Sequence, residues 1–288
     1  MTGGPQIAML ADGRRLHMHH GPIDLIIEAF GPTAEVVESY RQAARAFDGL
    51  LQRLVDELET LRTPIGDVPP FVAGPVARRM VRAVHRHRAA YVTPMAAVAG
   101  AVADEVLAAM IEGRVLDRAY VNDGGDIAIH LEPGHRFDVG LVSDIDAPAL
   151  DGVAAIDSAM PVRGIATSGR GGRSLSLGIA DSVTVLAADA AAADVAATLI
   201  ANAVDVDSGA VTRVPASEVC DDTDLGELPV VVDVGMLTES EIDAALAAGR
   251  MEAERMRRAG LIEGAVMGVR GRFSAVGGPA VIERRRAG

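Results

Sequence analysis

Three separate stretches of this 288-residue chain carry residue types that could bind a ligand. The first is Asn122-Asp123-Gly124-Gly125-Asp126, which interrupts an apolar strand pattern that runs from Tyr120 to Leu131. Strand interiors disfavour Gly, Asn and Asp, because Gly packs nothing and the short polar side chains compete for backbone hydrogen bonds. The stretch therefore predicts a bulge, a turn or a close approach of the backbone to a ligand, and we interpret it as the wall of a ligand site.

The second stretch runs from Gly164 to Ser174, where a predicted strand leads into a loop of Gly, Thr, Ser and Arg. Gly allows backbone N–H groups to converge on phosphate oxygens, Thr167 and Ser168 add hydroxyl donors, and Arg170 and Arg173 supply charge. This composition suits anion binding. A flexible hairpin turn with ordinary surface arginines would have the same composition, so both interpretations stay open.

The third stretch contains Asp194 and Thr198, which lie four residues apart on a predicted helix and therefore face the same way. A carboxylate and a hydroxyl on an Ala-lined face suit a hard cation whose other ligands are phosphate and water. The alternative is local: Asp194 complements the helix dipole, and Thr198 bonds back to its own helix.

The composition limits what the ligand and its partners can be. All 27 basic residues are Arg, so no lysine is available for a Schiff base or for a phosphate. A net charge of −13 and only 3% aromatic residues argue against nucleic acid. A single cysteine, Cys220, excludes an internal disulfide, and the chain shows no signal peptide and no clean apolar run of about 18 residues. We expect a cytoplasmic protein that does not span or bind a membrane.

The hydrophobic pattern predicts helices and strands without a regular βαβ alternation, which indicates an α+β fold. Thr33 is expected to cap the first helix, and residues 132–135 to form a hairpin turn. No repeat or linker divides the chain, so we expect a single domain over residues 1–288. Helices rich in small residues pack closely, which favours a homodimer. Paired strands are expected at 14–29 and a closing hairpin at 261–283. The other expected strands are 118–131, 136–142, 162–168, 182–187 and 228–234, and the expected helices are 33–63, 76–88, 94–112, 190–204 and 239–259.

Two further clusters carry charge or imidazole groups. His17 and His19 share one face of a predicted strand, next to His20, and could bind a transition metal; otherwise they lie at the surface or contact substrate. The helix at 76–88 is rich in Arg and His. Its basic side is expected to face solvent, another subunit or an acidic partner.

Taken together, the three stretches resemble the ApbE family of Mg-dependent flavin transferases. In that family a Gly-Gly-Asp or Gly-Gly-Asn turn, an Ala-Thr-Ser-Gly segment, a Ser-Val-Thr-Val strand and an Ala-Asp-Ala-x-x-Thr helix follow in this order. The matches here are Asn122–Asp126, Ala166–Gly169, Ser182–Val185 and Ala193–Thr198, so the resemblance covers about residues 91–205. Residues 96–104 are similar to the family's Gly-Ile-Ala-Lys-Gly helix, and residues 16–24 resemble the start of a bacterial and archaeal branch related to ApbE.

The resemblance implies an α+β domain of mixed and antiparallel sheets packed against helices, which binds FAD and Mg. Asp194 and Thr198 would be side-chain ligands of Mg, with the backbone carbonyl of Ala96 as a third ligand. ApbE enzymes cleave FAD at the pyrophosphate, release AMP and join FMN to a Ser or Thr of an acceptor protein. The residues expected to line the flavin nucleotide are Asn122, Gly124, Gly125 and Asp126, and those expected against its phosphates are Thr167, Ser168 and Gly169.

This chain departs from the family pattern at two places. Ala99 stands where the family has Lys, and the family's His-Ile-Ile-Asp-Pro loop is replaced by Leu177-Gly178-Ile179-Ala180-Asp181. Asp181 could replace the lost base if it is desolvated. The resemblance therefore implies either an enzyme that transfers FMN or hydrolyses FAD, or a flavin-binding accessory protein without catalysis. A third alternative is an enzyme that acts on another small anionic substrate in the same pocket.

Overall fold

The structure is a computed structural model that describes residues 4–141, 152–172 and 174–277. Its helices and antiparallel strands confirm the α+β class. The contacts between residues cluster into two compact units. A single domain over residues 1–288 stays a prediction. Unit 1 comprises Met1–Arg136, Asp157–Ile165 and Ala188–Asp194, and unit 2 comprises Phe137–Ile156, Ala166–Ala187 and Val195–Gly288.

The sheet of unit 1 is built from antiparallel neighbours in chain order, and β5 is followed by the first residues of β8. The expected strand pair at 14–29 is confirmed as β2 and β3, whereas β1 was not expected. Alternate residues of β4 are buried, as the period of two in a strand requires. The strands are β1 (Gln6–Met9), β2 (Leu16–His20), β3 (Ile23–Phe30), β4 (Arg118–Asp123), β5 (Asp126–Leu131) and β8 (Gly164–Ser168).

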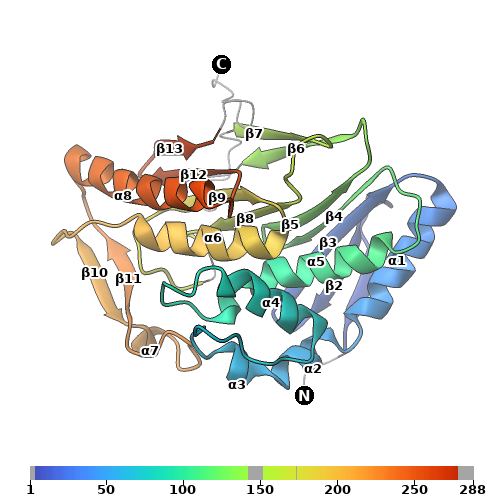
Figure 1. Ribbon diagram of the computed structural model, residues 1–288, viewed down its shortest axis with the longest axis horizontal. Coiled ribbons are helices and arrows are strands. Elements are labelled where there is room, and N and C mark those ends of the chain that lie inside the picture. Colours follow the sequence, from blue (N-terminus) through green and yellow to red (C-terminus); the bar gives the residue numbers. More distant parts are fainter. Residues whose placement is uncertain (1–3, 142–151, 173, 278–288) are drawn as a thin grey trace. The chain divides into compact units, whose positions relative to one another are not determined.

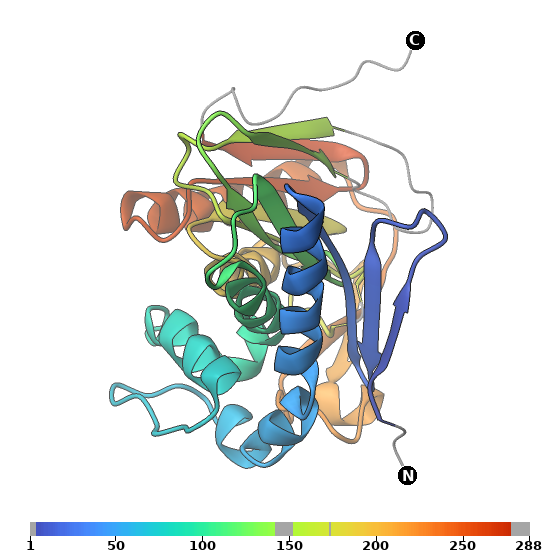
Figure 2. The ribbon, with the colours of Figure 1, turned by 90° about the vertical axis from the view of Figure 1, so that its right-hand side faces the viewer.

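The helices of unit 1 lie on one side of strands β1–β3 (Figure 2). α5 contacts α1 and α4 and covers β4 and β5. These helices are α1 (Thr33–Phe47), α2 (Leu50–Val55), α3 (Leu58–Leu61), α4 (Pro75–His85) and α5 (Val98–Ile111), with a 3₁₀ turn η1 (Pro94–Ala97) before α5.

The prediction of one helix over residues 33–63 was wrong, because the chain breaks it twice. Gly49 adopts a φ of 66° between α1 and α2, in the left-handed region that Gly tolerates, and residues 56–57 separate α2 from α3. Thr33 is also not the cap: α1 begins at Thr33, and Pro32 occupies the N-cap position without a side-chain hydrogen bond.

The stretch formed by η1 and α5, residues Pro94–Ile111, is long and apolar enough to cross a membrane, and no other helix in the described part of the chain is. Half of this stretch is buried inside the protein. Because α5 packs against two helices and two strands, its apolar character is accounted for by the core of unit 1.

In unit 2, β8 continues from Ala166 and is followed in the sheet by β9, β12 and β13, and α8 packs on β12 and β13 (Figure 1). The predicted hairpin across residues 132–135 was wrong, since β6 pairs with β7. The elements are β6 (Arg136–Leu141), β7 (Gly152–Asp157), β9 (Ser182–Ala187), β10 (Val211–Pro215), α7 (Ala216–Val219), β11 (Pro229–Val234), α8 (Glu239–Arg258), β12 (Gly264–Val269) and β13 (Arg272–Val276).

Candidate functional site

The Asn122–Asp126 stretch is a tight turn that joins β4 to β5 in unit 1. Asp123 and Asp126 pair across the two strands, and Gly124 and Gly125 form the turn with φ values of 63° and 114°. The side chain of Asn122 accepts a hydrogen bond from the Gly125 N–H at 2.8 Å. Of the three alternatives left open by the sequence, the turn is the one found, and the prediction of one strand over 118–131 was wrong.

Asp123 is the residue of this turn that the sequence analysis did not select. It continues the buried face of Ala119 and Val121, and only 4% of it is exposed. Its carboxylate accepts a hydrogen bond from the Asp24 N–H at 3.4 Å. Asn122 points to the opposite face of the sheet and is partly exposed. The alternation along β4 was the signal that could have identified Asp123.

The first turn of α6 (Ala190–Ala203) and the start of α5 cap each other in unit 1. Asp104 of α5 accepts hydrogen bonds from the N–H groups of Ala190 at 3.0 Å and Ala191 at 2.9 Å. In return, Asp194 of α6 accepts a hydrogen bond from the Gly100 N–H at 3.0 Å. The first N–H groups of a helix lack partners within the helix and form its positive end, so both carboxylates satisfy donors that would otherwise be unpaired.

This reciprocal capping requires the two helices to lie very close together. A Cβ atom added to Gly100 of α5 would lie 2.3 Å from the Ala190 carbonyl oxygen of α6. The start of α6 also lies close to β8, because a Cβ atom added to Gly164 would lie 2.0 Å from the carbonyl carbon of Asp189. Only Gly permits these approaches. The small residues of the two predicted helices therefore serve contact between the helices.

The acidic side chains of this region perturb one another. Burial raises the pKa of Asp194 to about 7, and the charges of Asp123 and Asp104 add to the effect. Burial likewise raises the pKa of Asp104 to about 6, with a contribution from Asp189. Backbone N–H donors oppose both shifts. Burial is thus the main cause of both pKa shifts, and the neighbouring carboxylates add to it.

The other two proposed Mg ligands belong to α6 and to η1. Thr198 follows Asp194 by one helical turn of α6, Ala96 lies in η1, and both are partly exposed. Within the described residues, no group of three or more His, Cys, Asp and Glu side chains could hold a metal ion. A cation here would thus need hydroxyl, carbonyl or ligand oxygens besides Asp194.

The Thr167-Ser168-Gly169 segment lies at the end of β8, in unit 2. The hydroxyl of Thr167 lies 2.9 Å from the hydroxyl of Thr184 on β9. Thr167 is exposed, Ser168 is partly exposed and Gly169 is buried. The Ser168 hydroxyl and the backbone groups of this segment are the donor types that an anion site requires. Arg173, the second arginine expected there, lies outside the described residues.

Asp181, the candidate replacement base, connects two loops of unit 2. One carboxylate oxygen lies 3.1 Å from Arg170 Nε, and the other accepts a hydrogen bond from the Arg270 N–H at 2.5 Å. The Asp181 N–H donates to the Gly268 carbonyl at 2.9 Å. To accept a proton, the carboxylate would have to weaken one of these contacts. Its catalytic role stays a prediction.

Two of the histidines on β2, His17 and His19, lie near each other, whereas the ring of His20 lies 6.5 Å from that of the buried Phe47. His17 Nε2 lies 2.5 Å from a carboxylate oxygen of Asp24, and both side chains are exposed by more than a third. The rings of His17 and His19 are 6.4 Å apart, which agrees with their expected position on one face.

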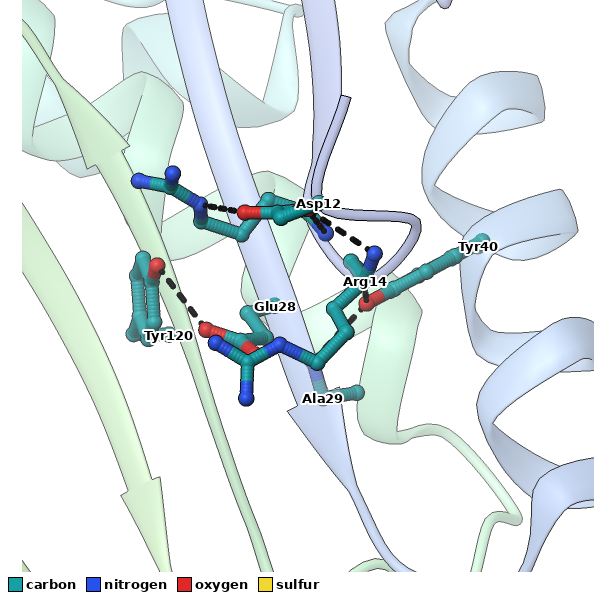
Figure 3. A network of polar contacts seen from close by, with 7 residues as sticks. Asp12, Arg14, Glu28, Ala29, Tyr40 and Tyr120 are labelled. Atoms are coloured by element: carbon teal, nitrogen blue, oxygen red, sulfur yellow. Dashed lines mark hydrogen bonds and ion pairs between the residues drawn. The ribbon is translucent and has the colours of Figure 1, made fainter. Parts of the chain in front are cut away.

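A second polar network lies where the β1–β2 connection meets β3 (Figure 3). Glu28 accepts a hydrogen bond from the Tyr120 hydroxyl at 3.3 Å and lies 3.5 Å from Arg14 Nε. Tyr40 of α1 donates to the Arg14 carbonyl at 2.6 Å and accepts from the Ala29 N–H at 3.2 Å. Burial, together with the Glu28 charge, raises the pKa of Tyr120 to about 12, so its hydroxyl stays a donor. The network fastens the connection to the sheet.

Comparison with known sequences places the chain in a family. The sequence profile of the family described as AbpE bacteria matches residues 7–275. The chain belongs to this family. A UPF0280 protein from Methanothrix thermoacetophila is 38% identical over 143 residues, which cover 49% of this chain and 57% of that protein. A UPF0280 protein from Methanopyrus kandleri is 33% identical over 228 residues, which cover 77% of this chain and 90% of that protein. The chain thus matches little more than half the length of the first of these relatives.

Comparison with solved structures agrees with this family. The flavin transferase ApbE from Vibrio cholerae superimposes with a TM-score of 0.51 at 14% identity, and the match covers 96% of this chain and 98% of that chain. At this identity the likeness shows the fold alone. It confirms the ApbE-like α+β fold that the motifs indicated.

Within this AbpE-family chain, the structure divides the expected site residues between the two units. Unit 1 contains Ala96, Asn122, Gly124, Gly125, Asp126 and Asp194, and unit 2 contains Thr167, Ser168, Gly169, Asp181 and Thr198. In unit 1, the fold brings Asp194, Asp123 and Asp104 within electrostatic reach of one another although they are distant in sequence. The roles carried over from ApbE to all these residues stay predictions.

Proposed function

We propose that this protein binds a flavin nucleotide, FAD in the first instance, together with Mg²⁺. The observation that supports the proposal is the partly buried Asp194 carboxylate, whose pKa is raised by burial and by Asp123. A divalent cation beside Asp194 would relieve this repulsion and stabilise the ionised carboxylates. Carboxylate, hydroxyl and carbonyl oxygens are the donor types that Mg²⁺ prefers, so the residues present fit this ion.

The proposed metal ligands are Asp194, Thr198 and the backbone carbonyl of Ala96. The Gly100 N–H holds one oxygen of Asp194 at 3.0 Å and so fixes the orientation of the carboxylate. When bound, Mg²⁺ would neutralise charge on phosphate oxygens.

The proposed nucleotide contacts follow the same resemblance. The turn residues Gly124 and Gly125 carry no side chain, so a flat ring system could lie against their backbone, with Asn122 and Asp126 on either side. Thr167, Ser168 and Gly169 would contact phosphate oxygens through hydroxyl and N–H donors. The side-chain carbonyl oxygen of Asn122 already accepts a hydrogen bond from the Gly125 N–H, which leaves the side-chain NH₂ group for a ligand.

Turnover would be a second property of the same site. In hydrolysis, a water oxygen attacks the phosphorus of the FMN half, the bond from that phosphorus to the AMP oxygen breaks, and FMN and AMP are formed. In transfer, a Ser or Thr hydroxyl of an acceptor protein replaces the water. In both cases a base must take the proton of the attacking hydroxyl, and Asp181 is the proposed base.

A non-catalytic accessory role is the second candidate function. Two observations favour it: Ala99 stands in place of the family's Lys, and both oxygens of Asp181 are already in contact with donors. Binding of another small anionic substrate in the same site is a further alternative. A cytoplasmic location and a homodimer complete the proposal as expectations from the sequence.

The test is to measure FAD affinity by titration calorimetry with and without Mg²⁺, and to assay AMP and FMN by chromatography. Asp194→Asn keeps one oxygen for the Gly100 N–H but removes the charge, so we expect the Mg²⁺-dependent part of the affinity to fall by at least tenfold. Asp221→Asn, at an exposed loop position, is the matched control. FAD binding without AMP release identifies the accessory role. Absence of FAD binding, or binding that ignores both Mg²⁺ and Asp194→Asn, contradicts the proposal.

A further inference from the structure

The surface of α4 differs in charge from the rest of the chain. Residues 64–92, which contain α4 and its flanking loops, carry five Arg and one Asp and no other Asp, Glu or Lys. The whole chain has a net charge of −13. We define the α4 surface as the exposed residues Val68, Phe71, Arg78, Arg82, Arg86 and Arg88.

The loop before α4 runs alongside the helix (Figure 2). At one end, His85 Nε2 lies 2.9 Å from the Asp67 carbonyl oxygen. At the other end, the guanidinium of Arg78 donates to the Ala73 carbonyl oxygen. The loop is therefore fixed to both ends of α4, and Val68 and Phe71 lie between these two contacts.

The arginines form a line on the exposed side of α4. Arg78, Arg82 and Arg86 recur every four residues and are exposed, so they span about 12 Å along the helix. Among the described residues, no carboxylate forms an ion pair with Arg78 or Arg82. Arg88 lies 3.8 Å from the fully exposed carboxylate of Asp67, a pair that solvent weakens. The charges of Arg78 and Arg82 are thus not paired with a carboxylate in the described part of the chain.

Two large apolar side chains accompany this line of charge. Phe71 is 93% exposed and Val68 is 83% exposed. The fold gains nothing from these side chains, because neither contributes to its core. Aromatic and Arg side chains are the types that dominate binding energy at protein interfaces.

We propose that the α4 surface docks an acidic segment of a partner protein, in which carboxylates face the arginines and an apolar side chain contacts Phe71 and Val68. The inference goes beyond the flavin site and does not depend on it. A protein segment fits better than a membrane, because the apolar face of α4 is buried in unit 1 and the α4 surface offers only Phe71 and Val68 for insertion. It fits better than nucleic acid, because the overall charge of −13 opposes a polyanion beyond this small face.

The test uses two labelled 12-residue probes, one of Glu alone and one in which two central Glu are replaced by Leu, with fluorescence anisotropy as the readout and no FAD present. We expect the Leu-containing probe to bind more tightly, and salt to weaken the binding of both probes. Arg78→Glu/Arg82→Glu should weaken both probes at least tenfold. Phe71→Ser should weaken only the Leu-containing probe and reduce it to the affinity of the Glu probe.

The control Arg250→Glu/Arg258→Glu makes the same charge change at exposed positions of α8 and should leave both affinities within twofold of the parent. Circular dichroism establishes that each variant is folded, and Phe71→Ser is expected to fold because its side chain is exposed. Equal weakening by the control pair would overturn the proposal. The proposal would also be overturned if the same residues preferentially bound phosphatidylserine vesicles or a 20-base-pair DNA duplex. It would be overturned, too, if the protein self-associated and Arg78→Glu/Arg82→Glu abolished this self-association.

Discussion

Asp104→Asn tests the reciprocal capping of α5 and α6 through its dependence on pH. The carboxylate of Asp104 accepts hydrogen bonds from two N–H groups at the start of α6, yet burial raises its pKa from 3.8 to about 6. A carboxyl group with a higher pKa in the folded state than in the unfolded state binds more protons when folded. The free energy of unfolding therefore falls as pH rises through the window between the two values.

The size of this effect follows from the shift. About two pKa units correspond to about 3 kcal/mol, and partial exposure of Asp104 reduces the expected value to about 2 kcal/mol. Asn cannot ionise, so the variant lacks this pH-dependent contribution to the free energy of unfolding. It keeps one oxygen as an acceptor and loses the second acceptor, which costs about 1–2 kcal/mol at every pH. The free energy of unfolding of the variant minus that of the parent should thus rise by about 2 kcal/mol between pH 4 and pH 7.5.

The assay is urea unfolding followed by circular dichroism at a series of pH values, since the chain has no Trp. Asp221→Asn, at an exposed position, is the control and should show a constant difference from the parent. A difference for Asp104→Asn that stays constant, or falls as pH rises, would refute the reasoning. It would show that the positive end of α6 stabilises the carboxylate by more than burial destabilises it.

Three other contacts can each be tested by a single substitution. Gly100→Ala should lower the free energy of unfolding, measured in urea, by about 2 kcal/mol, because the added Cβ would lie 2.3 Å from a carbonyl oxygen. This overpacking exceeds the gain of about 1 kcal/mol in helix propensity. The control Gly209→Ala, where the added Cβ meets open space, should change the free energy of unfolding by less than about 0.5 kcal/mol. Tyr40→Phe removes the hydroxyl that bonds to the Ala29 N–H and the Arg14 carbonyl, so the free energy of unfolding should fall by about 1–2 kcal/mol and the thermal midpoint should fall with it. An unchanged midpoint would show that water replaces the hydroxyl. Asp181→Asn should increase proteolytic cleavage near Arg170, because the charge that holds that loop is lost, and equal cleavage rates in variant and parent would contradict the anchoring role.

The local pattern predicted most elements because burial imposes its period on the sequence. The strand pair at 14–29 and the helices at 190–204 and 239–259 were each found at nearly the expected positions, whereas residues 118–131 form two strands joined by a turn. The failures have two causes, and apolar periodicity reports neither. The break at Gly49 and the turn at Gly124-Gly125 depend on local backbone geometry. The pairing of β6 with β7 depends on a strand that is distant in the sequence.

The sequence by itself determined the class of the fold, the family resemblance and the residue types of the candidate site, because these depend on composition, order and spacing along the chain. Only the tertiary structure decided which side chains meet. It brought Asp123 into electrostatic reach of Asp194, showed that Asp104 and Asp194 cap opposite helices, and placed both oxygens of Asp181 against donors. The physical reason is that burial and neighbouring charges set the behaviour of a carboxylate, and both come from residues that lie far away in the sequence.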